Sequence, residues 1–243
     1  MKAAAVSFRT LLATLLLVPA FAQAQGDVRP SLPDVSTLPI VELRAAAHSG
    51  TLAIVLSGDG GWADIDRQIG QTLAQRGVDV IGFDNRSYLR SGTRTADGTA
   101  ADVQRIAQHY LPLWGDTRLV LVGYSRGADF APFVATRLTP ELRSRLALIA
   151  MLGLLEHASF RYRFSDLWST TSNPKDAPVL PELERLRGAN MLCVYGKKEN
   201  ESLCREVDPT LVYPVAREGA HHFDGDYRAL TDLILARLAL RPQ

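Results

Sequence analysis

The sequence has no excess of charge of either sign, few cysteines and no long apolar run. Lysine and arginine total 27 and aspartate and glutamate 26, so the basic excess typical of proteins that follow nucleic-acid phosphates is missing, and we expect no nucleic-acid partner. Repeats and heptads are also missing, which excludes collagen and coiled coils. The apolar content of 47% excludes a disordered chain and predicts one globular domain.

The most apolar stretch lies near the N-terminus and is too short to cross a bilayer. It covers residues 11–22, whereas a spanning helix needs ~20 residues. Lys2 and Arg9 supply a basic start, and the sequence AQA at 22–24 offers a cleavage site, so we interpret residues 1–24 as a signal peptide. No cysteine follows this stretch, which argues against a lipoprotein. We therefore expect a periplasmic protein that is not an integral membrane protein.

The only two cysteines are Cys193 and Cys204. An even number of cysteines in an exported chain favours a disulfide bond. The alternative is two separate buried thiols. A bond between them would close a short loop and stabilise the fold by ~3 kcal/mol.

Short apolar stretches alternate along the chain with stretches whose apolar residues recur at helical spacing. The expected strands cover 51–56, 78–83, 119–122, 146–152, 191–195 and 211–215, and the expected helices cover 62–76, 101–113, 128–138 and 227–240. This alternation predicts an α/β fold with a mostly parallel central sheet and helices on both faces. Prolines and small polar residues in 25–38 predict an extended leader before a domain that covers 39–243.

One long interval, 154–188, breaks this alternation. Aromatic residues and arginines alternate at 160–164, and Trp168 follows. Intervals of this length in a compact domain are often functional. The pattern fits either an amphipathic strand or an apolar cap over a lipid-like substrate, and the sequence does not separate the two.

The strongest chemical motif is GYSRG at 123–127, a match to GxSxG. An apolar strand is expected just before it and a helix rich in small residues just after it. This is the strand, sharp turn and helix of a nucleophile elbow, in which glycines leave room for a strained turn. We therefore expect Ser125 to be an exposed nucleophile.

A nucleophilic serine needs a base, and the base needs a carboxylate that orients it. In this kind of fold the acid and then the histidine follow later strands. Glu199 lies three residues beyond the glycine that ends its strand and is the expected acid, with Glu201 in reserve. His222, which directly precedes an aromatic residue, is the expected base, with His221 as the alternative.

The oxyanion of an acyl-transfer reaction needs two main-chain N–H donors. We expect them from Arg126, after the nucleophile, and from Asp59, in the glycine-rich loop that follows the strand 51–56. That loop reads GDGG rather than GxGxxG, and the histidine pair lacks HxH or HExxH spacing. We therefore expect no metal ion and no cofactor.

Four motifs together resemble the VirJ/AcvB family of bacterial periplasmic proteins. They are GDGGW at 58–62, GYSRG at 123–127, the YGxxE loop with its flanking cysteines, and GxHHFDGDY at 219–227, and the resemblance spans 39–240. It implies an α/β-hydrolase fold, a role in virulence beside type IV secretion, and a triad of Ser125, a glutamate of 196–201 and a histidine of the pair. The sequence departs from the pattern that we expect at Lys197 and Lys198 and at 92–97.

The resemblance also implies a substrate, because members hydrolyse aminoacyl-phosphatidylglycerol and remove lysine or alanine from this lipid. The aminoacyl ester carries a cationic amine on one side and a phosphodiester on the other. Candidates to face these charges are Asp59 and Asp84 for the amine, and Arg86, Arg90 and Arg126 for the phosphate. The alternatives are a broad carboxylesterase and a non-catalytic accessory that binds secretion-system proteins.

Overall fold

A computed structural model describes residues 31–162 and 173–240 of the chain. They form a seven-stranded sheet in the order β1-β3-β2-β4-β5-β8-β9. Its strands are β1 (Ile40–Leu43), β2 (Thr51–Leu56), β3 (Asp79–Phe83), β4 (Arg118–Tyr124), β5 (Leu146–Leu152), β8 (Met191–Gly196) and β9 (Tyr213–Arg217). Only β1 pairs antiparallel to its neighbour; the other pairs are parallel. The predicted α/β architecture is confirmed.

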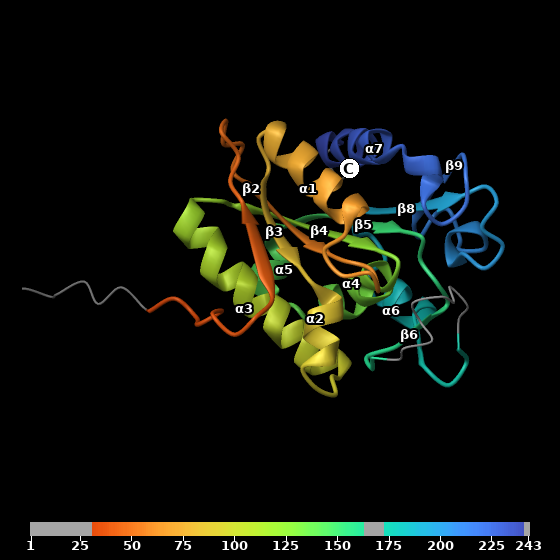
Figure 1. Ribbon diagram of the computed structural model, residues 1–243, viewed down its shortest axis with the longest axis horizontal. Coiled ribbons are helices and arrows are strands. Elements are labelled where there is room, and N and C mark those ends of the chain that lie inside the picture. The colour runs from red at the N-terminus through yellow and green to blue at the C-terminus, as the bar shows by residue number, and fades with distance from the viewer. Residues whose placement is uncertain (1–30, 163–172, 241–243) are drawn as a thin grey trace, which may run out of the picture. The chain divides into compact units, whose positions relative to one another are not determined.

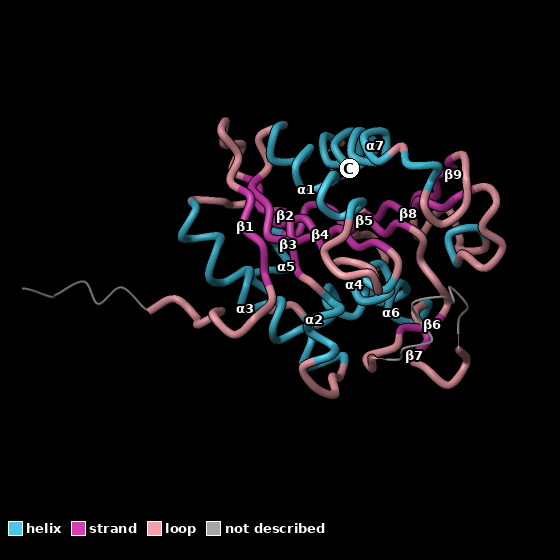
Figure 2. Tube along the Cα trace, viewed as in Figure 1, coloured by secondary structure: helices cyan, strands magenta, loops and turns pink. Residues whose placement is uncertain are grey.

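Helices cover both faces of the sheet (Figure 1). On one face lie α1 (Asp64–Gln75) and α7 (Tyr227–Ala239). On the other lie α2 (Asn85–Arg90), α3 (Ala96–Trp114), α4 (Arg126–Arg137), α5 (Pro140–Arg145) and α6 (Leu180–Arg185). The tube view shows the strands of this sheet as one layer between these two sets of helices (Figure 2).

The central strands are apolar along their whole length because both of their faces are covered. In β2 every residue is buried. Leu52, Ile54 and Leu56 belong to the core under α3 and α4, whereas Ala53 and Val55 belong to the core under α1 and α7. Successive side chains of a strand point to opposite faces, so an unbroken apolar run fills two cores at once.

The packed part of the chain begins earlier than the sequence suggested. Val35, within the expected leader, is only 6% exposed and belongs to the core. His109 of α3 places Nδ1 2.7 Å from the carbonyl oxygen of Pro33. The end of the leader therefore packs on α3. The expected signal peptide, 1–24, lies outside the described residues, and none of the described helices is both long and apolar enough to cross a membrane.

The described parts of the interval 154–188 contain a two-stranded antiparallel sheet, β6 (His157–Ala158) with β7 (Ala177–Pro178), followed by α6. After β6, the ring of Phe160 stacks on Phe130 of α4 with centroids 4.5 Å apart. The start of the aromatic stretch thus packs on the helix that follows Ser125. Residues 163–172, including Trp168, lie outside the described residues.

Candidate active site

Ser125 lies in the sharp turn between β4 and α4. Its backbone has φ 53° and ψ −122°, a region that non-glycine residues rarely adopt. A Cβ at Gly123 would lie 2.2 Å from the carbonyl oxygen of Gly127, and a Cβ at Gly127 would lie 1.9 Å from that of Leu56. Both flanking glycines are therefore required by close backbone contacts, and the sharp turn predicted from GxSxG is present.

Ser125, His221 and Glu199 form one hydrogen-bonded line. His221 Nε2 lies 2.8 Å from Ser125 Oγ, and His221 Nδ1 lies 2.5 Å from Glu199 Oε1. The imidazole and the carboxylate are both buried, with each residue 9% exposed. An imidazole with a carboxylate on one nitrogen and a hydroxyl on the other is positioned to accept the hydroxyl proton.

The structure differs from the prediction in which histidine faces the serine: it is His221 rather than the expected His222. The imidazole of His222 is exposed, and its Nδ1 lies 3.0 Å from the hydroxyl of Tyr124. Partial desolvation, followed by the charge of His221, lowers the pKa of His222. The histidine directly before the aromatic Phe223, which was the expected base, is therefore not the one that faces Ser125.

His221 faces the serine because of the way the loop after β9 packs on the loop after β8. The N–H of Lys198 donates to the carbonyl oxygen of Gly219 at 2.9 Å. A Cβ on Gly196 would lie 2.3 Å from the carbonyl oxygen of Ala220. Residue 221 is therefore the one that adjoins the loop of the acid. Phe223, with φ 52°, then turns into the core beside α1 and α7.

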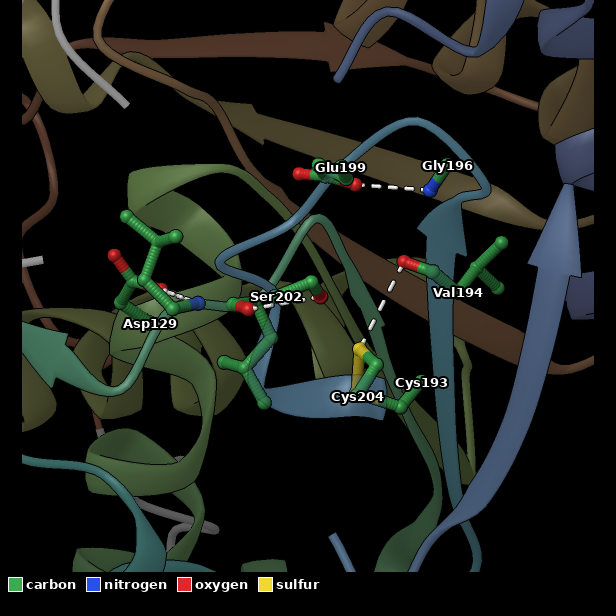
Figure 3. The surroundings of a disulfide bond; sticks show 9 residues. Asp129, Cys193, Val194, Gly196, Glu199, Ser202 and Cys204 are labelled. Atoms are coloured by element: carbon green, nitrogen blue, oxygen red, sulfur yellow. Dashed lines mark hydrogen bonds between the residues drawn. A yellow bond between two sulfur atoms is a disulfide. The ribbon is translucent and has the colours of Figure 1, made fainter. Parts of the chain in front are cut away.

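Glu199 is held by the end of its own strand. Its Oε2 accepts the N–H of Gly196 at 2.8 Å, and its own N–H donates to the Gly196 carbonyl oxygen at 2.9 Å. The predicted disulfide between Cys193 and Cys204 closes the loop that carries Glu199 (Figure 3). Glu201, the reserve acid, is exposed at the surface.

The glycine-rich loop after β2 lies against the nucleophile elbow. A Cβ on Gly58 would lie 3.3 Å from the Cβ of Ser125. Ser57, which begins this loop, accepts the N–H of Asn85 on its Oγ at 3.0 Å, so α2 holds the loop from behind. Asp59 follows directly. Arg126 begins α4, where helix N–H groups point toward the serine.

Four of the five side chains expected to face the charges of a substrate have partners within the protein. Arg126, 6% exposed, forms an ion pair through Nε with Asp59 and donates through an Nη atom to the carbonyl oxygen of Ser159 at 2.6 Å. Asp84 caps α2 by accepting the N–H of Ser87 at 3.1 Å. The guanidinium of Arg90 lies 5.8 Å from the ring centre of Tyr162. For Arg86, Nε is buried without a hydrogen-bond partner among the described residues.

A buried carboxyl beside Arg126 was not expected from the sequence. Asp129 lies in the first turn of α4, is 4% exposed and accepts the N–H of Leu155 at 2.8 Å. Desolvation raises the pKa of Asp129 to about 8, against the lowering effect of Arg126. This carboxyl fixes the chain that leaves β5 onto the helix of the nucleophile.

Gly153, directly after β5, forms the wall behind the histidine and was also missed. Its φ is +69°, and a Cβ there would lie 2.7 Å from His221 Cε1 and 3.3 Å from Glu199 Oε1. Any side chain at this position would collide with the hydrogen-bonded pair. The signal in the sequence is a glycine at the end of the strand 146–152, on the same edge of the sheet as the serine.

Solved structures share this fold at low sequence identity. The protein is similar to TT1662 from Thermus thermophilus, with a TM-score of 0.55, 18% identity and coverage of 84% of this chain and 95% of the other. Est1E from Butyrivibrio proteoclasticus has a TM-score of 0.55 and 13% identity, with coverage of 83% of this chain and 93% of the other. An alpha-beta serine hydrolase homologue from Coxiella burnetii has a TM-score of 0.55 and 16% identity, with coverage of 82% of this chain and 91% of the other. The chain thus has the α/β-hydrolase fold.

Comparison of the sequence with families and with curated proteins gives one match. No curated protein matches the chain significantly. A family model described as bacterial virulence protein (VirJ) matches residues 50–242, which include the serine, acid and histidine loops. That match covers well over half of the sequence, and the chain therefore belongs to the VirJ family.

Proposed function

We propose that this protein is a serine hydrolase that cleaves the aminoacyl ester of lysyl- or alanyl-phosphatidylglycerol. The observation that carries the proposal is the hydrogen-bonded line from Ser125 through His221 to Glu199. A hydroxyl, an imidazole and a carboxylate in this order are the working parts of a serine hydrolase.

In the first half of the reaction, Ser125 Oγ attacks the ester carbonyl carbon while its proton moves to His221 Nε2. The carboxylate of Glu199 holds the tautomer with the proton on Nδ1 and stabilises the imidazolium. The bond between the carbonyl carbon and the glycerol oxygen then breaks. That oxygen takes the proton from Nε2, so phosphatidylglycerol leaves and the aminoacyl group stays on the serine.

In the second half, water attacks the acyl-enzyme and gives its proton to His221. Collapse of the second tetrahedral intermediate returns the proton to Ser125 Oγ and releases the free amino acid. The negative oxygen of each intermediate is stabilised by the N–H groups of Arg126 and Asp59. Support for this assignment is the close approach of Gly58 to the serine and the position of Arg126 at the start of α4.

The substrate class and the cellular site rest on other support. Membership of the VirJ family and the resemblance to VirJ/AcvB proteins favour the aminoacyl lipid. The disulfide favours an oxidising compartment, in agreement with an exported, periplasmic protein whose residues 1–24 are removed. The protein would then meet the lipid headgroup at the membrane surface, with secretion-system proteins as candidate partners.

The direct test is incubation of the purified protein with vesicles that contain lysyl- or alanyl-phosphatidylglycerol, with release of free amino acid as the readout. Ser125→Ala is expected to lower kcat by at least about 10³-fold. His221→Ala is expected to cause a loss of the same order. His222→Ala is the matched control, and we expect it to stay within about 10-fold of the wild type, because its ring does not contact Ser125.

Three results would contradict parts of this proposal. Equal turnover of short neutral esters and of the aminoacyl lipid would make the protein a broad carboxylesterase. A larger loss in His222→Ala than in His221→Ala would overturn the identity of the base. Retention of a secretion phenotype by the folded but inactive Ser125→Ala variant would indicate that binding, rather than hydrolysis, is the cellular role.

A further inference from the structure

A second cluster of chemically active side chains lies at the opposite end of the sheet from Ser125. Asp79 is the first residue of β3, Asp116 lies two residues before β4, and His48 lies in the connection from β1 to β2. Because β2, β3 and β4 are parallel, their first residues share one edge. Ser125 follows the far end of β4, a seven-residue strand, which places the two sites roughly 20 Å apart.

The three side chains converge on one point. One ligand atom from each lies within 4.8 Å of those of the other two. His48 Nδ1 is 2.9 Å from Asp79 Oδ2 and 3.7 Å from Asp116 Oδ1. The side chains of both aspartates are fully buried, whereas that of His48 is 38% exposed. A small ion would reach the cluster from the histidine side.

The two carboxylates of the cluster differ in their hydrogen bonds. Asp79 accepts the N–H of Ala45 at 2.7 Å, and Arg44 Nε lies 3.5 Å from its Oδ1. By contrast, both carboxylate oxygens of Asp116 are buried with no hydrogen-bond partner among the described residues. A buried carboxylate whose oxygens accept no hydrogen bond is costly, and an ion that accepts its lone pairs would remove the cost.

We propose that His48, Asp79 and Asp116 bind a divalent transition-metal ion, with zinc as the first candidate. Imidazole nitrogens and carboxylate oxygens are both zinc ligands in proteins, and zinc sites with three protein ligands take water in the fourth position. The imidazole donor disfavours calcium and magnesium, which prefer sets made only of oxygens. This proposal departs from the expectation that the protein has no metal ion, which was drawn from the glycine-rich loop and the histidine pair alone.

The metal would have a structural role and would take no part in hydrolysis. It would join the connection after β1 to the starts of β3 and β4, where main-chain bonds already hold the same connection. The N–H of Ser49 donates to the carbonyl oxygen of Gly77 at 2.9 Å, and the N–H of Thr117 donates to that of Gly50 at 3.0 Å. Binding to the folded state alone would raise its stability.

The test is calorimetric titration of the chelator-treated protein with Zn²⁺, with the thermal midpoint measured in the presence and absence of the ion. We expect one ion per chain and a higher Tm. Asp116→Asn, which keeps the shape of the side chain, and His48→Ala, at the surface, are each expected to weaken zinc binding at least about 10-fold. Cobalt(II) should bind with visible absorption that the same variants lose.

His222→Ala is the matched control, because the histidine pair beside Glu199 could also attract zinc. It is expected to bind zinc as the wild type does. The proposal is overturned if zinc does not bind at micromolar concentration, if His48→Ala and Asp116→Asn bind it unchanged, or if His222→Ala alone loses it. Calcium or magnesium binding as tight as that of zinc would overturn the metal class. If Asp116→Asn does not fold, His48→Ala decides.

Discussion

Ser125 carries local backbone strain. Its φ of 53° is unfavourable for any residue with a Cβ, and the two flanking glycines cannot be enlarged to relieve it. Such strain persists only where the surrounding structure imposes it, here through the contacts of Gly123 and Gly127. The turn exposes the hydroxyl to His221 at a cost in stability.

This cost can be measured with two substitutions that both remove the hydroxyl. Ser125→Gly relieves the strain, whereas Ser125→Ala retains the Cβ and therefore the strain. We expect the glycine variant to be more stable than the alanine variant by about 1 kcal/mol in urea unfolding. Both variants should be inactive. An alanine variant at least as stable as the glycine variant would show that the turn is not strained.

Asp66 of α1 predicts a pH dependence of stability. It is 1% exposed, and its Oδ1 has no hydrogen-bond partner among the described residues. Desolvation raises the pKa of Asp66 from 3.8 to about 7. The folded state thus holds this proton more tightly than the unfolded state. The contribution of protonated Asp66 to the stability of the fold is therefore fully present below pH 4 and is lost as the pH rises to 7.

We expect Asp66→Asn to remove this loss and to be more stable than the wild type at pH 8, by a few kcal/mol at most. At pH 4 the free energies of unfolding of the variant and the wild type should be nearly equal. Urea unfolding at both pH values measures the difference. Asp64→Asn is the control, because Asp64 lies in the same first turn of α1 but is exposed. A wild-type advantage that grows with pH would contradict the assignment.

The sequence identified most of the candidate site but not its orientation. GxSxG specified Ser125 because the motif is imposed by backbone contacts that depend only on the local chain. Glu199 followed from its position after a strand. The choice between His221 and His222 depends on how two loops from β8 and β9 pack on each other, which no local pattern encodes. The partners of Arg126 were missed for the same reason.

At the scale of elements, the site is assembled from loops at the carboxyl ends of neighbouring parallel strands. Ser125 follows β4, Gly153 follows β5, Glu199 follows β8 and His221 follows β9. These four strands are consecutive in the sheet. Residues far apart in the sequence therefore meet without any long excursion of the chain.

The strand ends make Gly153 a test of this assembly. Gly153→Ala would place a methyl group 2.7 Å from the imidazole of His221, and we expect kcat/KM to fall by at least about 10²-fold. Gly188→Ala is the matched control, because Gly188 also has a positive φ, +89°, but a Cβ there would meet nothing within 4 Å. It should lose stability and keep its activity. Equal activity losses in both would contradict a specific contact.

The long apolar elements were predicted more reliably than the short ones. All six expected strands exist, although β3 and β9 begin later than expected. β1 was missed because it is a short edge strand with one exposed residue among partly buried ones, and so lacks the apolar run of a central strand. Helices α2, α5 and α6, six residues each, are too short for a helical period to be recognised.

At the scale of the molecule, the two ends of the sheet carry separate chemistry. The hydrogen-bonded line that starts at Ser125 lies where the parallel strands end. The cluster of His48, Asp79 and Asp116 lies where they begin. The sequence gives no sign of the second cluster, because its members come from three separate segments and only the parallel register brings them together.

This separation predicts additive effects. Asp116→Asn should leave hydrolysis unchanged, and Ser125→Ala should leave zinc binding unchanged. In the double variant, the changes in the free energy of unfolding should add within about 0.5 kcal/mol, as is usual for sites with no shared contacts. Urea unfolding of the four proteins of this cycle measures the sum. A larger deviation would reveal coupling through the sheet.

Arg126 ties three separate parts of the chain together at the nucleophile. Its guanidinium binds Asp59 in the glycine-rich loop and the carbonyl oxygen of Ser159 beyond β6, while its own N–H groups belong to the helix start beside Ser125. Displacement of the stretch after β6 would therefore move Arg126 and Asp59 together, and these are the two residues whose N–H groups we propose to bind the oxyanion. A substrate group that displaced this stretch would therefore change turnover in addition to occupying space.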